Sequence, residues 1–378
     1  MDIKVCELQF KFLKESAYMS FTDKKREEIK KYILRKIALD DADVISKTMD
    51  NFGISVTSVK RYLQDAVKNG SVKMAEDNVC GYRLTEQVYC EQISLTEEPL
   101  EEDKLFRAHI AEHLSFCNDA AFRIWQYVCA EMLNNAIEHS TGKNIYIEVR
   151  VNALYSKVII VDDGVGAFQT LLQYMKANGW NNPGIEDAVV ELYKGKITSN
   201  AASHSGEGIF FTSKMTDEFV IWSDAQVYLS GHGKDNRTIQ SHLLAYTSRL
   251  RKIGTMVCMS LENETERKIA EVFDMYTDIE KGFIKTRIPV KEACISGEPT
   301  ARSQARRICN RLEEFKEVIF DFSNVEFLGQ GFADEIFRVY ATAHPEIELC
   351  PVNMLPEVER MIRHVGRGQL PENVKLAM

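Results

Sequence analysis

Residues 131–139 read EMLNNAIEH and lie inside a long apolar run that starts near Ala120. No proline or glycine interrupts this run, which predicts a mostly buried helix. Glu131, Asn135 and His139 are four residues apart, so they fall on one side of that helix. A carboxylate, a carboxamide and an imidazole on a buried helix are costly unless each has a partner. The stripe is therefore either a solvated polar face of an amphipathic helix or part of a binding site.

Three glycine-containing segments follow this helix along the chain. An apolar strand ends in a carboxylate and two glycines at residues 158–166 (VIIVDDGVG), and residues 205–211 (SGEGIFF) open a further helix. The pair Gly254-Thr255 then leads into the strand MVCMSL at residues 256–261. Each glycine pair alone is weak evidence because any of them can form a turn. The order and spacing of all four segments are specific.

This combination resembles the GHKL nucleotide-binding fold shared by gyrase-type ATPases, mismatch-repair ATPases, sensor histidine kinases and anti-sigma-factor serine kinases. The resemblance covers roughly residues 95–263 and implies an α/β sandwich with a mixed sheet. The G2 box is matched only loosely, without the longer glycine run of many kinases. The matching positions are Glu131, Asn135, Ala136 and His139 (N box), Asp162, Gly164 and Gly166 (G1 box), Gly206 and Gly208 (G2 box), and Gly254 with Thr255.

The resemblance implies ATP and Mg²⁺ as ligands. Asn135 would ligate Mg²⁺ through its amide oxygen, because this ion takes few protein ligands and keeps several waters. Glu131 matches the residue that orients and deprotonates the attacking water in the hydrolysing branches. Asp162 would accept a hydrogen bond from the adenine amine, with Thr255 beside it. The role of His139 stays open between this site and helix-end packing.

The glycines and one lysine complete the implied nucleotide site. Gly164 and Gly166 would permit close backbone approach to the nucleotide. Gly206 and Gly208 at a helix start would present N–H groups to phosphates. The segment between Gly166 and Gly206 corresponds to the family's mobile lid. Lys194 and Lys196, just before the G2 box, could reach phosphates as point charges or could simply be solvated.

Residues 21–85 resemble a winged helix-turn-helix. Thr22 and Ser55 are predicted helix caps, and Gly53 supplies the turn between the second and third helices. Between residues 22 and 73 there are twelve Lys and Arg against eight Asp and Glu, a local charge of +4 in a chain of −9. The resemblance implies that the third helix contacts double-stranded DNA, although many such modules bind proteins instead. The candidate DNA contacts are Ser55, Thr57, Ser58, Lys60, Arg61 and Lys73.

The C-terminal part, from about residue 283, alternates strands and helices and resembles a STAS domain, the module of anti-sigma-factor antagonists. Residues 321–331 (DFSNVEFLGQG) match the strand-to-helix turn of that family. In the family this turn holds a phosphorylatable Ser or Thr followed by glycine, whereas Gln330 and Gly331 occupy it here. This departure favours a protein-binding or dimerisation domain over a phosphoacceptor.

Composition limits the remaining possibilities. The net charge of −9 excludes a basic footprint over the whole molecule, so any nucleic-acid surface is local. The nine cysteines form no CxxC motif and no Cys/His pairing at zinc spacing. We expect a cytoplasmic protein because the thiols are scattered and the N-terminus has no apolar core. We expect no membrane segment because no long apolar run is present.

The sequence thus predicts a multidomain α/β protein. The expected parts are residues 1–20 (N-terminal segment), 21–85 (winged helix), 86–104 (linker or strap), 105–263 (GHKL domain), 264–282 (connector) and 283–378 (STAS-like domain). The resemblances favour an ATP-dependent regulatory switch, a homodimer that hydrolyses Mg-ATP slowly and binds DNA and a protein partner. Two alternatives stay open: a serine/threonine protein kinase of anti-sigma type, and a nucleotide sensor without hydrolysis.

Overall fold

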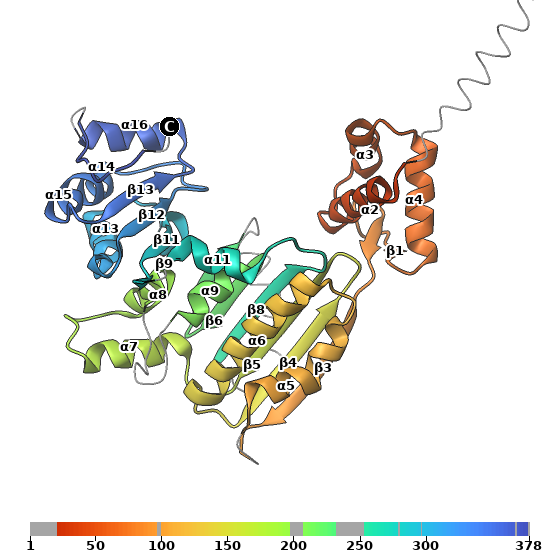
Figure 1. Ribbon diagram of the computed structural model, residues 1–378, viewed down its shortest axis with the longest axis horizontal. Helices are drawn as coiled ribbons and strands as arrows, with labels where there is room; N and C mark the ends of the chain where they lie inside the picture. Colours follow the sequence, from red (N-terminus) through yellow and green to blue (C-terminus); the bar gives the residue numbers. More distant parts are fainter. Residues whose placement is uncertain are drawn as a thin grey trace, which may run out of the picture. The chain divides into compact units, whose positions relative to one another are not determined.

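The computed structural model describes residues 21–96, 100–196, 207–231, 253–278, 280–295, 297–366 and 369–376 (Figure 1). The predicted segment 1–20 and the predicted site residue Gly206 lie outside these residues. The chain divides into two compact units. Unit 1 runs to Gln87 and includes Asn152–Leu154, and unit 2 contains the rest. The central and C-terminal parts therefore belong to one unit.

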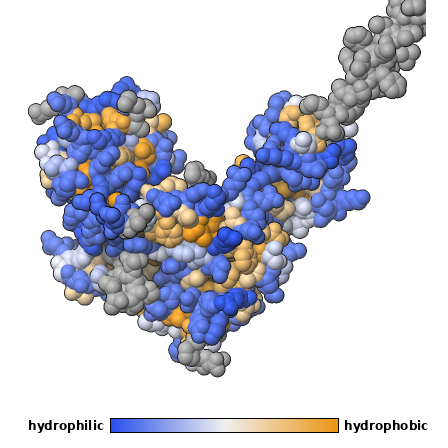
Figure 2. Space-filling model, in the orientation of Figure 1, coloured by the Kyte–Doolittle hydropathy of each residue, from blue (hydrophilic) through white to orange (hydrophobic). Residues whose placement is uncertain are grey.

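Unit 1 consists of three helices and a two-stranded antiparallel hairpin: α2 (Asp23–Ala38), α3 (Val44–Phe52), α4 (Val56–Lys68), β1 (Val72–Met74) and β2 (Tyr82–Leu84). Its core is formed by Ile29, Ile33 and Ile37 of α2, Val44 of α3, Val59 and Leu63 of α4, and Val72 and Leu84 of the hairpin. These apolar positions recur at helical spacing, which is why the three helices were predictable. Hydrophilic residues cover most of the face of this unit that Figure 2 shows.

Short polar contacts fix the ends of the unit 1 helices. The predicted caps are confirmed: the Thr22 hydroxyl accepts from the Lys25 amide at 3.3 Å, and the Ser55 hydroxyl accepts from the Ser58 amide at 3.2 Å. Gly53 ends α3 in the left-handed region, with φ 64°. Asp40, after α2, accepts from the amides of Val79 and Cys80 at 3.1 and 2.9 Å. The Asp40 carboxylate therefore connects the loop of the hairpin to the end of α2 by hydrogen bonds.

A six-stranded sheet in the order β3-β4-β5-β8-β6-β7 forms the centre of unit 2. Its strands are β3 (Gln87–Ser94), β4 (Asn144–Val151), β5 (Tyr155–Asp162), β8 (Thr255–Glu262), β6 (Glu218–Ser223) and β7 (Gln226–Gly231). The pairings β4–β5, β5–β8, β8–β6 and β6–β7 are all antiparallel, so these four pairings do not show the mixed directions expected for this sheet.

Helices pack on one face of this sheet: α5 (Glu102–His109), η1 (Ala111–Leu114), α6 (Asp119–His139) and α9 (Gly208–Met215). The predicted buried helix is confirmed as α6, which buries Trp125, Val128 and Leu133 among others. The Trp125 indole donates to the Ser156 hydroxyl of β5 at 3.0 Å, which fixes the helix on the sheet. Two further helices, α7 (Ala167–Ala177) and α8 (Ile185–Lys194), follow β5 along the chain.

The C-terminal part of unit 2 contains a three-stranded parallel sheet in the order β11-β12-β13. The predicted alternation of strands and helices is confirmed there within a few residues. Its elements, with those of the connector, are α11 (Ile269–Tyr276), β9 (Thr277–Asp278), β10 (Gly282–Phe283), β11 (Lys285–Pro289), α12 (Val290–Ala293), α13 (Arg302–Cys309), η2 (Leu312–Glu314), β12 (Glu317–Asp321), α14 (Gln330–Asp334), η3 (Glu335–Tyr340), α15 (Ala341–Ala343), β13 (Glu348–Val352) and α16 (Pro356–Val365). We call residues 283–376 the C-terminal module and the rest of unit 2 the central module.

Two stretches of unit 2 differ from the sequence interpretation. The range interpreted as a linker contains the edge strand β3 and the start of α5. The range interpreted as a polar lid contains α7 and α8, and α8 is buried from Ala188 to Lys194. Within the described residues, no helix is both long and apolar enough to cross a membrane.

Candidate functional site

The end of α6 and the glycine turn after β5 are in direct contact. The Val165 amide donates to the Ser140 carbonyl, one residue after α6, at 2.7 Å. A β-carbon built on Gly164 would lie 1.9 Å from the same carbonyl oxygen. Only glycine fits this approach, because the obstacle is backbone. The fold thus brings together the N-box and G1 segments predicted to form one site.

Asp162 is the buried centre of this region. Its carboxylate accepts from the amides of Gly164 at 2.9 Å and Thr255 at 3.3 Å. A β-carbon on Gly254 would lie 2.4 Å from the same oxygen. Burial raises the pKa of the Asp162 carboxyl to about 6, although the hydrogen bonds from Gly164 and Thr255 act to lower it. The predicted adenine-binding residue and its predicted threonine neighbour therefore lie together.

A second polar cluster adjoins Asp162 where β6 ends. The Ala167 amide donates to the hydroxyls of Ser223 and Thr255 at 2.9 and 3.0 Å. The Ser223 hydroxyl bonds to Asp224, which also accepts from the Gln169 amide at 2.9 Å. Sequence reasoning did not select Ser140, Ser223 or Asp224. None of the three belongs to a sequence motif, and what they share is their position at or just after the end of α6 or β6.

Glu131 lies against the start of α9. A β-carbon on Gly208 would stand 2.1 Å from the Glu131 Oε2 atom, so the absence of a side chain at Gly208 makes room for this carboxylate. Glu207, which precedes the helix, is half-buried, and burial raises the pKa of its carboxyl. Burial also raises the pKa of the Tyr127 hydroxyl, with further contributions from the negative charges of Glu131 and Glu207. Glu131 therefore lies beside Gly208, one of the predicted phosphate-binding glycines.

Asn135 is half-buried one helical turn after Glu131. Its amide makes no hydrogen bond to the residues that the structure describes, so its oxygen is available to a ligand. Carboxylate and amide oxygens are the donors that Mg²⁺ prefers, and Asn135 fits the single-ligand role that the resemblance implies. His139, half-buried at the end of α6, does have interaction partners in the structure.

The two lysines before the G2 segment both contact the C-terminal module. Lys194 is 2% exposed, pairs with Glu191, and donates to the carbonyls of Arg307 at 3.2 Å and Asn310 at 2.5 Å. Lys194 is therefore neither solvated nor free to reach phosphates, the two possibilities left open by the sequence, since its donors are occupied inside the protein. The Lys196 ammonium donates to the Glu314 carbonyl at 2.7 Å. Its role at phosphates stays a prediction.

The raised pKa of Asp162 predicts a pH dependence of stability. The folded protein holds this proton up to about pH 6, whereas the unfolded carboxyl loses it near its ordinary value of 3.8. Between these values the folded state binds more protons, so the contribution of Asp162 to stability falls as pH rises. Across this window, we expect Asp162 to lower the free energy of unfolding by about 3 kcal/mol.

The measurement is urea unfolding of the parent and Asp162→Asn proteins between pH 4 and 7. Asparagine cannot ionise, so the difference between the two proteins isolates this carboxyl. Parallel stability profiles for parent and variant would contradict the assignment.

The candidate DNA-contact residues lie on α4, before it, and on the hairpin of unit 1. Thr57, Lys60, Arg61 and Lys73 are exposed. Ser55 is also exposed, but its hydroxyl caps α4, and Ser58 is half-buried and bonded to it at 3.1 Å. Within the described residues, Lys60, Arg61 and Lys73 form no ion pair. By contrast, Lys25, Arg26 and Lys30 of α2 each pair with a carboxylate one turn away.

The predicted STAS-like turn lies between β12 and α14. Gln330 is exposed, and a β-carbon on Gly331 would meet its nearest neighbour at 3.4 Å, with ordinary backbone angles. The position before Gly331 therefore carries a glutamine and no hydroxyl, and the hydroxyl of Ser323, earlier in the same turn, donates to Asp321 at 2.7 Å. Residues 304–359 match the family described as STAS-like domain of unknown function (DUF4325). No curated protein matches the chain.

Proposed function

We propose that this protein is an ATP-dependent regulatory switch that binds Mg-ATP at the site between α6, the turn after β5 and the start of β8. The observation that supports this most is that three segments distant in the sequence contact α6 or one another along one side of the domain. Asp162 bonds to the Gly164 and Thr255 amides, Ser140 contacts Gly164, and Glu131 contacts Gly208. A structural polar stripe on α6 would not require the other three segments to converge on it.

The side chains of the site have distinct roles in this proposal. Asp162, buried and aligned by two amides, accepts from the exocyclic amine of adenine and discriminates against guanine. Asn135 holds Mg²⁺, which when bound neutralises charge on the phosphates. Glu131 takes a proton from a water whose oxygen bonds to the γ-phosphorus, while the bond to the β–γ bridging oxygen breaks and ADP leaves. Hydrolysis then resets the switch.

The output of the switch is a change in dimerisation, in DNA binding by unit 1 and in protein binding by the STAS-like domain. ATP can drive such a change only through different affinities for two states of the protein. The C-terminal module belongs to the same unit as the nucleotide site, which supports a direct link between them.

We expect Asn135→Ala to weaken Mg-ATP binding at least about tenfold, because the ion loses its only protein ligand in this proposal. Asn134→Ala is the matched control: it is the neighbouring residue of the same type and is also half-buried. Calorimetric titration of both variants with ATP, with and without Mg²⁺, tests the site. The proposal fails if Asn135→Ala protein binds nucleotide, dimerises and binds DNA like the parent.

The fate of the γ-phosphate separates the proposal from its alternatives. Full-length protein is incubated with Mg²⁺ and ATP labelled on the γ-phosphate. Free phosphate supports the hydrolytic switch. Label on an added or copurified protein partner supports a kinase, and label on this chain requires an acceptor outside the Gln330-Gly331 turn. Bound but intact ATP supports a sensor.

For unit 1, we expect Lys60→Gln/Arg61→Gln to weaken binding to double-stranded DNA and to lower the slope of log affinity against log salt by about 0.9 for each lost phosphate contact. Both side chains are exposed and lack ion-pair partners among the described residues. The control Lys24→Gln/Lys30→Gln removes the same charge from α2, where both residues are also exposed. Fluorescence anisotropy with a labelled duplex measures both; equal losses in the two variants would indicate a net-charge effect alone.

A further inference from the structure

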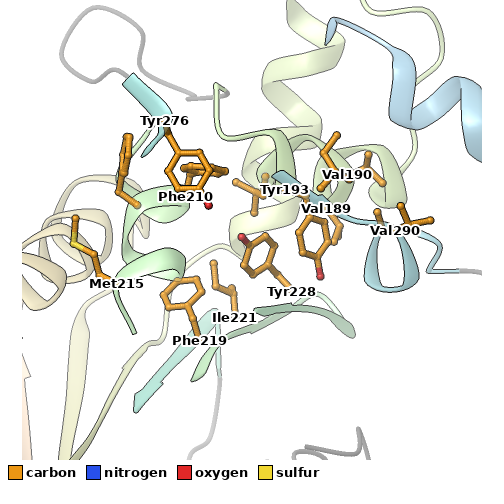
Figure 3. Packing of buried hydrophobic residues seen from close by; sticks show 14 of the residues in the cluster. Val189, Val190, Tyr193, Phe210, Met215, Phe219, Ile221, Tyr228, Tyr276 and Val290 are labelled. Atoms are coloured by element: carbon orange, nitrogen blue, oxygen red, sulfur yellow. The ribbon is translucent and has the colours of Figure 1, made fainter. Parts of the chain in front are cut away.

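The C-terminal module holds the end of α8. The Thr286 hydroxyl of β11 donates to the Lys194 carbonyl at 2.9 Å, at the last residue of the helix. Within the central module, α8 packs against the six-stranded sheet, where Tyr193 stacks on Tyr228 of β7 with ring centroids 4.3 Å apart (Figure 3). Figure 3 also shows Val290 of the C-terminal module close to Val189 and Val190 of α8. The helix is thus shared by the two modules.

Charged contacts reinforce both ends of α8. At its first turn, the Arg307 guanidinium pairs with Glu186 at 2.7 Å and Asp187 at 2.8 Å. At its last turn, the buried Lys194 ammonium donates to the carbonyls of Arg307 and Asn310. Residues 307–310, at the end of α13 and just after it, therefore contact both ends of α8.

Lys196 follows this helix and lies between the two modules. Its ammonium donates to the Glu314 carbonyl and stands over the Phe315 ring, 4.5 Å from the centroid. Burial lowers the pKa of the Lys196 amine, and the negative charges of Glu314 and Glu207 oppose this shift. Glu207 immediately precedes Gly208, the residue against Glu131. The same ammonium is thus bonded to the C-terminal module and lies near the start of α9.

The helix α9 also packs against the C-terminal module. Phe210 and Phe211 have ring centroids 4.8 and 5.4 Å from that of Phe283, and Phe283 lies 5.4 Å from Phe315. Helix α9, which begins at Gly208, therefore rests on the C-terminal module, and Phe315 contacts both Phe283 and the Lys196 ammonium.

We propose that the C-terminal module is a built-in inhibitor of the nucleotide site, and that Lys196 is the group that switches. Without nucleotide, Lys196 is retained by the Glu314 carbonyl and the Phe315 ring. When Mg-ATP binds, the ammonium leaves these partners for the phosphate oxygens. This inference rests on the proposed function, which it extends by naming how the site is regulated.

The consequence is reciprocal coupling. If nucleotide binding must break the Lys196 contacts, then weakening those contacts raises the affinity for nucleotide. By the same linkage, nucleotide loosens the hold of the C-terminal module on Lys196. A partner that binds the C-terminal module and displaces Phe315 would then promote ATP binding.

The test is a double-variant cycle in the full chain, with calorimetric titration of the non-hydrolysable analogue AMPPNP and Mg²⁺ as the probe. Phe315→Leu removes the ring beneath the ammonium, and we expect it to tighten nucleotide binding roughly two- to tenfold. We expect Lys196→Met to weaken binding, because the phosphates lose a cation. In the Lys196→Met background, Phe315→Leu should have no further effect. Lys285→Met, which removes a partly exposed lysine of β11 paired with Glu317, should leave affinity unchanged.

The possible outcomes distinguish the two proposals. If the parent binds no Mg-AMPPNP, both the proposed function and this inference are wrong. If the parent binds Mg-AMPPNP but Phe315→Leu does not change the affinity, only this inference is overturned. The same holds if Phe315→Leu changes the affinity equally in the parent and in the Lys196→Met background. Because Phe315 is 1% exposed, each variant is first checked by circular dichroism, and Phe315→Met replaces any Phe315→Leu protein that does not fold.

Discussion

Gly164→Ala is expected to lower the free energy of unfolding of unit 2 by about 3 to 5 kcal/mol, a large part of the stability of a typical domain. The added methyl group would lie 1.9 Å from the Ser140 carbonyl oxygen and 2.5 Å from its carbon. Neither atom can rotate away, because both belong to the backbone at the end of α6. The turn after β5 and the helix would have to separate.

Two further glycines provide graded comparisons. A β-carbon on Gly166 would meet the Asp224 carboxylate at 2.1 Å, where a side chain can turn aside, so we expect a smaller loss for Gly166→Ala. Gly184→Ala should be close to neutral, since its nearest neighbour would lie at 3.5 Å. Trp125, Trp180 and Trp222 are the chain's three tryptophans and all belong to unit 2, so urea unfolding followed by tryptophan fluorescence reports on this unit. Equal stabilities for Gly164→Ala and Gly184→Ala would contradict the packing described here.

Glu131→Gln is expected to reduce ATP turnover by about 10² to 10⁴ while nucleotide binding is retained. Glutamine keeps the size and the polarity of the side chain beside Gly208 but cannot accept a proton from water. Asn135 and Asp162, which are assigned to binding, remain in place. The measurement is free phosphate released from γ-labelled ATP, with nucleotide affinity determined on the same preparation.

Glu138→Gln is the matched control for this experiment. It makes the same chemical change on the same helix, at an exposed position two turns further on. Turnover in the Glu131→Gln protein equal to that in the control would remove Glu131 from the chemistry. Retained turnover together with lost binding would instead place Glu131 among the binding residues.

The elements that sequence could predict are those whose signals are local. Thr22 and Ser55 begin helices and Gly53 ends one, each through contacts with residues within four positions, so a short motif suffices. The same holds for α6, where a long uninterrupted apolar run specifies a buried helix. The convergence of Asp162, Gly164 and Thr255 was predictable only because the order of the glycine segments resembles a known family.

The elements that sequence did not predict depend on distant partners or lack a periodic signal. Strand β3 is exposed along most of its length, so it shows no alternation of buried and exposed residues. The sequence left Lys194 between phosphate contact and solvation, yet its acceptors are carbonyls more than a hundred residues further along the chain. Nothing near Lys194 in the sequence identifies those carbonyls, because backbone oxygens are present at every residue.

The buried ammonium of Lys194 limits how this protein can be divided or recombined. If the chain were cut before β11, the ammonium would keep Glu191 but lose the carbonyls of Arg307 and Asn310, and the apolar side chains that α8 and α9 bury against the C-terminal module would be exposed. The central part should therefore express poorly as an isolated fragment. In descent by domain shuffling, a new C-terminal neighbour would have to supply carbonyls at the same place. The two modules are accordingly expected to be inherited as a pair, whereas unit 1 is joined without this constraint.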